Sequence, residues 1–301
     1  MNNLILHGSV MTQAQADINI LQIIKQNQSR FTPQQARIAN YLLNHHDKVA
    51  FLTATQLARE IGVSQPTVIR FAQLLGFPKF HLFVEAFQRL LRAELTSADR
   101  FNLSLLSDRP AFEGSSNIIL REIKTLTQFA RTFPQDAFDK VVKDICQSRS
   151  VSVLGTRGSA SLAQYLAYFL GKVKGNVFAC TNGSTNDFDR LLQLQSGDLV
   201  VALAFPRYPR ESVEMIRFCH KRNLRCIGIT DKPESPLTAF CDTNLIIPIT
   251  FSTIFDSYCS VLCLFNMLVT EVGKTSKEES ATLFHEFEEL ARDIKIFYER
   301  N

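Results

Sequence analysis

Residues 54–77, ATQLAREIGVSQPTVIRFAQLLGF, decide how the first part of this chain folds. The apolar residues Leu57, Ala58 and Ile61 recur at helical spacing. Gly62 follows them, at a point where many helices end in left-handed geometry. The first part of the stretch therefore predicts a short helix that ends near Ile61.

A second helix is expected to begin directly after this turn. Ser64 is a preferred N-cap residue, and the fixed φ of Pro66 suits a first helical turn. Four apolar side chains would face inward: Val68, Phe71, Ala72 and Leu75. Four polar side chains would face outward: Gln65, Thr67, Arg70 and Gln73. Because these polar types contact bases and phosphates, the pattern predicts a helix-turn-helix, although a plain helical hairpin fits it too.

The flanking sequence supports a DNA-binding domain over residues 18–95. Thr32, Pro33 and Gln35 combine an N-cap, a proline in the first turn and a capping-box glutamine, so a supporting helix precedes the motif. An amphipathic pattern after Phe80 predicts a closing helix. Between residues 25 and 92 there are nine Lys and Arg against three Asp and Glu, whereas the whole chain has a net charge of only +4. The positive charge therefore concentrates where nucleic acid would bind.

The length and composition of the chain fit two domains. It has 301 residues, and 46% of them are hydrophobic, which is enough for two cores. Ser, Asp, Asn and Pro accumulate over residues 96–116, which we interpret as a linker. The second domain is expected over residues 117–275. Residues 276–301 predict a C-terminal helix, whose apolar face either caps its own domain or packs on a second subunit.

The second half of the sequence alternates short apolar runs with helical patterns. The apolar runs, rich in β-branched residues, lie at 150–155, 176–180, 198–205, 225–230 and 244–249. Continuous apolar strands that alternate with helices imply a parallel sheet covered on both faces. The predicted fold class is thus α/β: an all-helical helix-turn-helix domain followed by a doubly wound parallel-sheet domain.

Three polar loops follow the first three predicted strands, at the edge where doubly wound sheets bind ligands. Their candidate ligand-binding residues are Thr156, Arg157 and Ser159, then Thr181 and Ser184, then Arg207 and Arg210. Helix N-termini and arginines both favour an anion, so a small anionic metabolite is expected there. Ordinary turn and cap chemistry explains each loop equally well, and Arg207 and Arg210 also suit solvent or a subunit contact. The first loop does not make G-x-G-x-x-G, so we expect no dinucleotide and no other cofactor.

The order of these features resembles the RpiR-type bacterial transcription regulators, with a sugar-isomerase-type (SIS) domain after the helix-turn-helix. The resemblance covers roughly residues 18–275. The family signature is matched by Val63, Ser64, Pro66, Thr67, Val68, Arg70, Phe71, Leu75, Gly76 and Phe77. It implies a dimer or higher homo-oligomer whose binding to a double-stranded DNA operator changes when the SIS domain binds a small, often phosphorylated, metabolite. In our interpretation, Ser64, Gln65 and Thr67 lie at the N-terminal end of the recognition helix near base edges, and Arg70 and Lys79 contact phosphates or guanine.

The ligand loops depart from the family pattern. The first loop keeps Gly155 and Ser159 of G-x-G-x-S but has Arg157 at the second glycine. In the phosphate loop, of S-x-S-G-x-[TS] type, four positions differ: Ala204, Pro206, Arg207 and Pro209. Three hydroxyl donors are therefore absent, and arginines stand nearby. This exchange predicts a carboxylate or a differently placed phosphate as the ligand.

Side chains for acid–base catalysis are weakly placed in the sequence, so we expect no enzyme and no catalytic residue. His220 lies in a charged helical stretch, Glu211 and Glu214 lie in a probable first helical turn, and His45 and His46 end a helix of the DNA-binding domain. Two alternatives stay open. One is a SIS-type sugar-phosphate isomerase, and the other is a DNA-binding protein whose SIS-type domain only dimerises.

The seven cysteines form no C-x-x-C motif, and no signal peptide precedes them, so we expect a reducing, cytoplasmic location. Cys259 and Cys263 share a helix face at i, i+4 spacing, for which core packing is the favoured interpretation over metal binding. We therefore expect no metal site. No uncharged apolar stretch reaches the length of a membrane span, so no membrane partner is expected.

Overall fold

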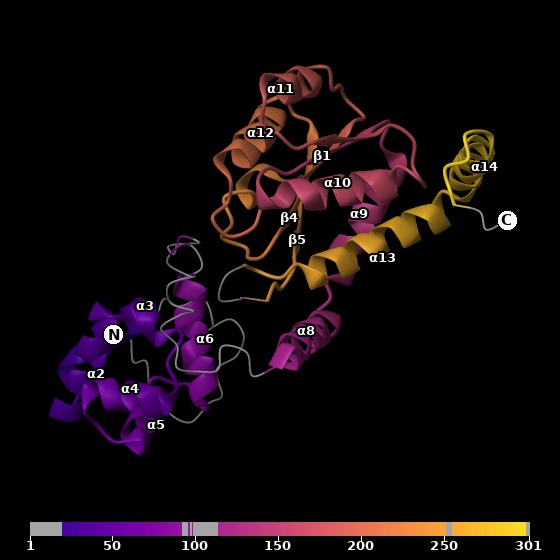
Figure 1. Cartoon of the computed structure of the whole chain (residues 1–301). Helices are drawn as coiled ribbons and strands as arrows, with labels where there is room; N and C mark the ends of the chain where they lie inside the picture. The colour runs from indigo at the N-terminus through magenta and orange to yellow at the C-terminus, as the bar shows by residue number, and fades with distance from the viewer. Residues whose placement is uncertain (1–19, 92–95, 97, 99–113, 251–254, 299–301) are drawn as a thin grey trace. The chain divides into compact units, whose positions relative to one another are not determined.

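The computed structural model describes residues 20–91, 96, 98, 114–250 and 255–298. These residues form two compact units, each described by itself: one with the helices up to α6, and one with the sheet and the helices from α8 onward (Figure 1). Most of the predicted linker, residues 96–116, lies outside the described residues, and its last three residues already belong to α8.

The first unit is entirely helical. Its elements are α1 (Ile20–Asn27), η2 (Gln28–Arg30), α2 (Pro33–Asn44), α3 (His46–Val49), α4 (Ala54–Ile61), α5 (Gln65–Leu74) and α6 (Phe80–Leu91). The helices share one core, in which Phe71, Phe83 and Phe87 are fully buried. Phe83 contacts Phe87 edge to face, with ring centroids 5.1 Å apart. Both predicted helices of the motif are present, and the four side chains expected to face inward from α5 are buried.

The second unit is built on a five-stranded parallel sheet in the order β2-β1-β3-β4-β5. Its strands are β1 (Val151–Leu154), β2 (Val177–Cys180), β3 (Leu199–Leu203), β4 (Arg225–Thr230) and β5 (Thr243–Ile246). Its helices are α8 (Gly114–Arg131), α9 (Gln135–Gln147), α10 (Gly158–Leu170), α11 (Thr185–Leu192), α12 (Arg210–Lys221), η3 (Thr238–Phe240), α13 (Cys259–Thr275) and α14 (Lys277–Asp293).

Helices cover both faces of this sheet (Figure 1). Along β3, Val201 and Leu203 face the core made with α9, α10 and α13, whereas Val200 and Ala202 face the core made with α11 and α12. All five residues of β3 are buried, which explains why the strand reads as a continuous apolar run. The doubly wound fold expected from the sequence is confirmed.

An ion pair joins the amino ends of β1 and β3. Asp198 accepts bonds from Arg149 Nε at 2.9 Å and Nη2 at 2.5 Å, from Ser150 Oγ at 2.8 Å and from the backbone N–H of Gln195 at 2.8 Å. The Arg149 guanidinium, with these other donors, lowers the pKa of Asp198 to about 2. Two strands that are 48 residues apart in sequence are thus held in register at their starting edge.

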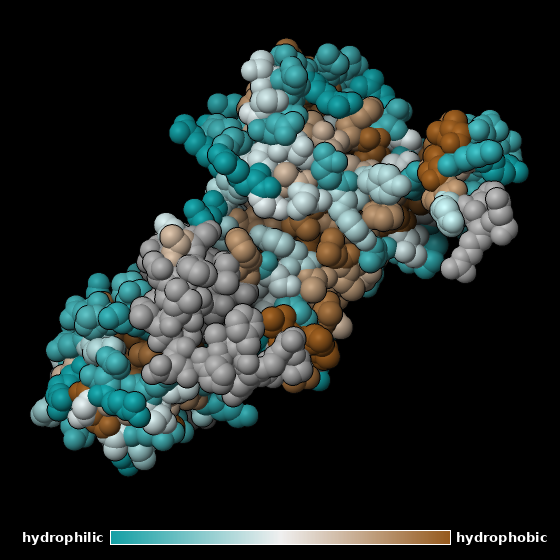
Figure 2. Space-filling view, viewed as in Figure 1, coloured by the Kyte–Doolittle hydropathy of each residue, from teal (hydrophilic) through white to brown (hydrophobic). Residues whose placement is uncertain are grey.

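The last helix, α14, packs on its own unit through its first turns, and further along Lys172 Nζ lies 3.3 Å from the ring centroid of Phe287. Glu279 accepts bonds from Lys174 Nζ at 3.2 Å and from the backbone N–H of Gly175 at 2.9 Å, and Ser280 donates to the carbonyl of Val173 at 2.8 Å. Three later apolar residues are exposed: Phe284 (49%) and Leu290 (51%) in the helix and Ile294 (62%) directly after it. Figure 2 shows hydrophobic side chains gathered along one side of α14.

Candidate functional site

Helix α5 has the division of faces expected of a recognition helix. Val68, Phe71 and Ala72 are at most 1% exposed. Gln65, Arg70 and Gln73 lie exposed on the other side, and Lys79 is exposed between α5 and α6. The polar side chains of α5 are therefore free to reach a groove of DNA.

Helix α4 and the turn that joins it to α5 are fixed by three features. Gly62 has φ of +73°, which closes α4 in left-handed geometry as its sequence position predicted. Arg37 of α2 donates from Nη2 to the carbonyl oxygen of Ile61 at 2.8 Å. Thr53 and Gln56 form a capping box at the start of α4. Arg37 was missed by the sequence analysis because its acceptor lies 24 residues away along the chain.

Ser64 and Thr67 lie at the start of α5, as predicted, and contact each other. Their hydroxyl oxygens are 2.7 Å apart. Ser64 is the N-cap residue, but its side chain makes no capping bond to a backbone N–H. Ser64 is exposed and Thr67 is half-buried, so this hydroxyl pair stands at the end of the helix that enters a DNA groove in helix-turn-helix proteins.

The carboxyl ends of β1 and β3 form the switch point of the second unit. After β1 the chain enters α10 on one face of the sheet, and after β3 it enters α12 on the other. Thr156, after β1, donates its backbone N–H to Ser212 Oγ of α12 at 3.0 Å, and the hydroxyl oxygens of the two residues are hydrogen-bonded at 2.9 Å. Both residues are buried. Ser212 was not predicted, because no local pattern links it to a position 56 residues earlier.

Arg157 stands at the N-cap of α10 with φ of +55° and ψ of −126°, a backbone conformation that favours glycine. At the position where the family pattern has glycine, this chain thus has a backbone conformation suited to glycine but carries an arginine. Its guanidinium is 77% exposed and lies 3.5 Å from Oε1 of Glu211, whose side chain is 39% exposed. Ser159, the second residue of α10, is buried.

The loop after β2 already holds a carboxylate of its own. Asp187 accepts from the backbone N–H groups of Asn182 at 2.9 Å, Gly183 at 2.7 Å and Ser184 at 3.4 Å. The Ser184 hydroxyl accepts the N–H of Asp187 in return, which makes a capping box for α11. Thr181 is half-buried at the start of this loop. The spacing of Ser184 and Asp187 was the available signal for this cap.

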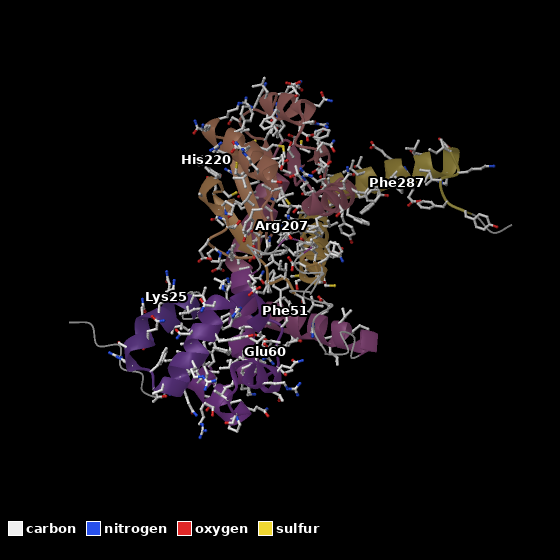
Figure 3. The ribbon with its side chains drawn as sticks, turned by 60° about the vertical axis from the view of Figure 1, so that its left-hand side comes forward. Lys25, Phe51, Glu60, Arg207, His220 and Phe287 are labelled. Carbon is white, nitrogen blue, oxygen red and sulfur yellow. The ribbon has the colours of Figure 1, made fainter. Side chains whose placement is uncertain are left out.

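The loop after β3 carries two exposed arginines. Arg207 has φ of +70°, again at a family glycine position, and Arg210 is the first residue of α12. Tyr208 donates to Asp231 at 2.8 Å, which ties this loop to the end of β4. Figure 3 labels Arg207 near one end of α12 and His220 near the other, so His220 lies away from the switch point.

The three loops converge on Glu211. A Cβ placed on Gly183 would lie 2.6 Å from Cβ of Glu211 and 3.5 Å from Cγ2 of Thr156. The structure therefore brings the loop after β2 against the first turn of α12 and against the loop after β1. Glu211, which the sequence analysis treated as a surface residue of a helix start, lies at the centre of this arrangement.

Two adjoining cavities lie at the opposite edge of the sheet. One is lined by Gln147, Ser148, Gln195, Gly197 and Asn223, among others, and an adjoining one includes Lys140 and His220. Asp144 borders both cavities and pairs with Arg225 at 2.8 Å. The switch point instead carries three exposed arginines, Arg157, Arg207 and Arg210, at the edge where doubly wound sheets bind ligands. It is therefore the stronger candidate for an anion.

The cysteines do not form a reactive or metal-binding centre among the residues that the structure describes. Burial raises the pKa of the Cys180 thiol to about 11 and of the Cys219 and Cys241 thiols to about 12, so these groups stay protonated. The expectation of core packing for Cys259 and Cys263 is wrong, since both are exposed on α13. Helix periodicity alone did not tell which face of α13 is buried.

Within the described part of the chain, none of the helices combines the length and the apolar character needed to cross a membrane.

Two family models match the chain. Residues 18–88 match the helix-turn-helix domain of the rpiR family, and residues 144–271 match the SIS domain. Each matched range falls on one of the two units described above.

Two solved structures show the same folds. The sugar isomerase domain of an RpiR transcription factor from Sphaerobacter thermophilus is 22% identical with a TM-score of 0.55, and the match covers 58% of this chain and 97% of that one. The Vibrio vulnificus NanR protein, solved as a complex with ManNAc-6P, is 20% identical with a TM-score of 0.57, and the match covers 93% of this chain and 100% of that one. This chain therefore joins a helix-turn-helix domain of the rpiR family to a SIS domain, which is the domain order of the RpiR-type transcription regulators that it resembles.

Proposed function

We propose that this regulator binds a double-stranded operator through α5 and that a small anion, bound at the switch point of the SIS domain, changes its affinity for that DNA. The observation that carries the proposal is the set of three exposed arginines, Arg157, Arg207 and Arg210, on the loops after β1 and β3. A hydrogen bond between two buried hydroxyls, that of Thr156 after β1 and that of Ser212 in α12, joins the two sides of this proposed site.

The DNA contacts proposed for α5 divide by position. Ser64, Gln65 and Thr67 stand at its N-terminal end, where base edges are reached. Arg70 is exposed further along the helix, and Lys79 follows the helix, so these two residues suit guanine or phosphates. The excess of basic residues between residues 25 and 92 adds a sequence-independent attraction to the phosphate backbone.

The ligand class follows from what the loops offer. An arginine guanidinium can bind two oxygens of a carboxylate or phosphate at once. Each of these arginines also lies beside the N-terminus of a helix, where the helix dipole disfavours a positive charge such as the guanidinium. An anion bound between them relieves that repulsion. The hydroxyls of Thr156 and Ser184 are bonded within the chain, so the charged groups carry more of the proposed binding than the neutral ones.

A phosphorylated sugar and a small carboxylate are both candidates. The ManNAc-6P complex of the NanR protein makes N-acetylmannosamine 6-phosphate a natural probe. Ala204, Pro206 and Pro209 supply no side-chain donors in this chain, which favours a carboxylate or a phosphate that sits closer to Arg157 and Arg210.

The SIS domain is proposed to bind its ligand without turning it over. Isomerisation between adjacent carbons needs a positioned base, and the carboxylates at the switch point, Asp187 and Glu211, are engaged with backbone N–H groups and with Arg157. His220 is remote from the switch point. Release of an isomerised product from a sugar-phosphate probe would replace this proposal by the isomerase alternative.

A homodimer is proposed as the DNA-binding form. One helix-turn-helix reads few base pairs, and two-fold pairing doubles the site. The exposed apolar face of α14, with Phe284, Leu290 and Ile294, is our candidate for the subunit contact.

The first experiment is a gel shift of the full-length protein on its own upstream DNA over a salt series. We expect affinity to fall steeply as salt rises, because released counterions drive the binding. Arg70→Ala should weaken specific binding by about 1–3 kcal/mol. Arg292→Ala, which removes one positive charge from exposed α14, is the matched control and should leave affinity within a factor of about two. Equal affinity of the Arg70→Ala variant and the wild type would remove Arg70 from the interface.

The second arm adds N-acetylmannosamine 6-phosphate or citrate to the same complex. Altered mobility or affinity with one of them assigns the ligand class. A complex that is indifferent to both would favour the alternative in which the SIS domain only holds the dimer together.

A further inference from the structure

We propose that Glu211 is an internal competitor for the effector: its carboxylate neutralises Arg157 in the unliganded protein, and the anionic group of the effector displaces it. This inference rests on the anion site proposed above and adds a specificity-determining residue to it. It starts from the fact that two of the three converging loops already hold a carboxylate of this chain, Asp187 in one and Glu211 in another.

The two carboxylates are held very differently. Asp187 is only 8% exposed and accepts three backbone N–H bonds, two of them at 2.9 Å or shorter. Removing it would take away the acceptor of three backbone N–H groups in a half-buried loop, which is costly. Asp187 is therefore a permanent part of the loop and is not displaced by a ligand.

The Glu211 carboxylate is held weakly. Its contact with Arg157 is 3.5 Å long, and both side chains are well exposed. An ion pair of this kind contributes little free energy, because water screens the two charges. The Glu211 pKa is lowered, first by the N–H of Glu211 itself and also by Arg157 and Arg210, so the group is an anion at neutral pH.

The stem of Glu211 is fixed although its carboxylate is not. Its Cβ lies against Gly183, at a point where a Cβ on that glycine would approach within 2.6 Å. The backbone of Glu211 is held in the first turn of α12, beside the buried Ser212. Rotation of the outer part of the side chain is thus sufficient to uncover the guanidinium of Arg157.

The pairing of Glu211 with Arg157 makes effector binding weaker and also more selective for strongly anionic ligands. A ligand that places two anionic oxygens on Arg157 replaces the single long contact with a bidentate one. A ligand that only approaches the loops meets the negative charge of Glu211. The residue therefore raises the effector concentration at which the regulator responds and disfavours neutral or weakly charged analogues.

The test compares dissociation constants for two probes, inorganic phosphate and citrate, by isothermal titration calorimetry on full-length protein. Glu211→Gln keeps the size of the side chain but removes its charge, and we expect it to bind the better probe about three- to fivefold more tightly than wild type. Glu214→Gln is the matched control. Glu214 lies in the same turn region of α12, pairs with Arg217 and loses the same charge without touching Arg157. Its dissociation constant should stay within twofold of wild type.

Two further variants exclude other causes. In an Arg157→Gln background, the gain from Glu211→Gln should disappear, because the charge that Glu211 masks is gone. Glu211→Asp keeps the charge but shortens the side chain, so it should fall between wild type and Glu211→Gln. Unchanged unfolding midpoints in urea verify that each variant is folded.

The outcomes separate the two proposals. If wild type binds one of the probes and Glu211→Gln binds it equally or more weakly, Glu211 is a bystander or a direct effector contact, and the displacement model is overturned. If wild type binds neither probe, the anion site itself fails, and the displacement model fails with it.

Discussion

Arg157 and Arg207 show, at the scale of single residues, how this chain departs from its family. Both have positive φ, at 55° and 70°, where the family pattern has glycine. Positive φ costs a residue with a side chain about 1–3 kcal/mol in strained cases. A strained arginine that the fold tolerates is a reason to expect that its guanidinium contributes to function.

Replacement of Arg157 by glycine should therefore separate stability from binding. Glycine relieves the backbone strain, which stabilises the folded state, but it also increases the entropy of the unfolded chain, which opposes this gain. The net result should be a free energy of unfolding that is higher by about 1 kcal/mol. Anion binding measured by calorimetry should be lost. Asn223→Gly is the control, since Asn223 also has positive φ, at 57°, but lies at the other end of α12. Retained anion affinity in Arg157→Gly would show that the arginine is not part of the site.

The lowered pKa of Asp198 predicts how the free energy of unfolding depends on pH. Its pKa, about 2 in the folded protein, lies below the usual value of 3.8. The folded state therefore binds fewer protons, and the carboxylate stabilises the protein above its unfolded pKa. This contribution is about 2 kcal/mol at pH 7 and is lost as the pH falls from about 5 to 2.

Urea unfolding of wild type and Asp198→Asn across this pH range measures the effect. We expect the variant to be less stable at pH 7 by about 2 kcal/mol and the two curves to converge as the pH approaches 2. A constant difference over the whole range would show that Asp198 acts through its hydrogen bonds alone and not through its charge.

At the scale of elements, the two helices of the DNA-binding motif are capped in different ways. Thr53 accepts the N–H of Gln56 at 3.1 Å in a full capping box, whereas Ser64 makes its contact with the hydroxyl of Thr67. A threonine N-cap contributes about 1 kcal/mol to stability. The start of α5 has no such side-chain cap.

The two caps therefore predict opposite phenotypes. Thr53→Ala should lower the free energy of unfolding by about 1 kcal/mol, as measured by urea denaturation followed by circular dichroism. Ser64→Ala should change stability by less than about 0.5 kcal/mol but weaken operator binding in a gel shift, because we propose that this hydroxyl contacts the DNA. Equal losses of stability in both variants would mean that Ser64 caps the helix in solution.

At the scale of the whole molecule, the exposed face of α14 predicts how the regulator assembles. Each apolar side chain that becomes buried in a subunit contact contributes about 1.5–3 kcal/mol to the free energy of association. In a two-fold interface both subunits bury the same side chain, so each substitution acts twice. Phe284→Glu and Leu290→Glu should raise the dimer dissociation constant by at least about tenfold. Sedimentation equilibrium measures this constant directly.

Thr282→Glu provides the matched control for assembly. It adds the same charge to α14 at an exposed position on the polar side of the helix. Its dissociation constant should match that of wild type. A dimer that survives Phe284→Glu and Leu290→Glu would place the subunit contact on another surface, such as the exposed Ile119 and Ile123 of α8.

Local patterns in the sequence determined the helices, the strands and their order along the chain. The spacing of Leu57 and Ile61, the glycine at 62 and the proline at 66 are short-range signals, and the structure places α4 and α5 where they indicated. The same is true of the buried strands, because a strand covered on both faces must be apolar throughout. The positions of the candidate ligand loops followed from the same alternation.

Only the tertiary structure decided which residues meet. Arg157 and Glu211 are 54 residues apart, and Thr156 and Ser212 are 56 apart. Their contacts depend on the order of β1 and β3 in the sheet and on the opposite faces taken by α10 and α12. The exposure of Cys259 and Cys263, and of the apolar face of α14, likewise follows from how helices pack. Periodicity shows that a helix has a face, but burial of that face depends on packing against parts of the chain that no local pattern identifies.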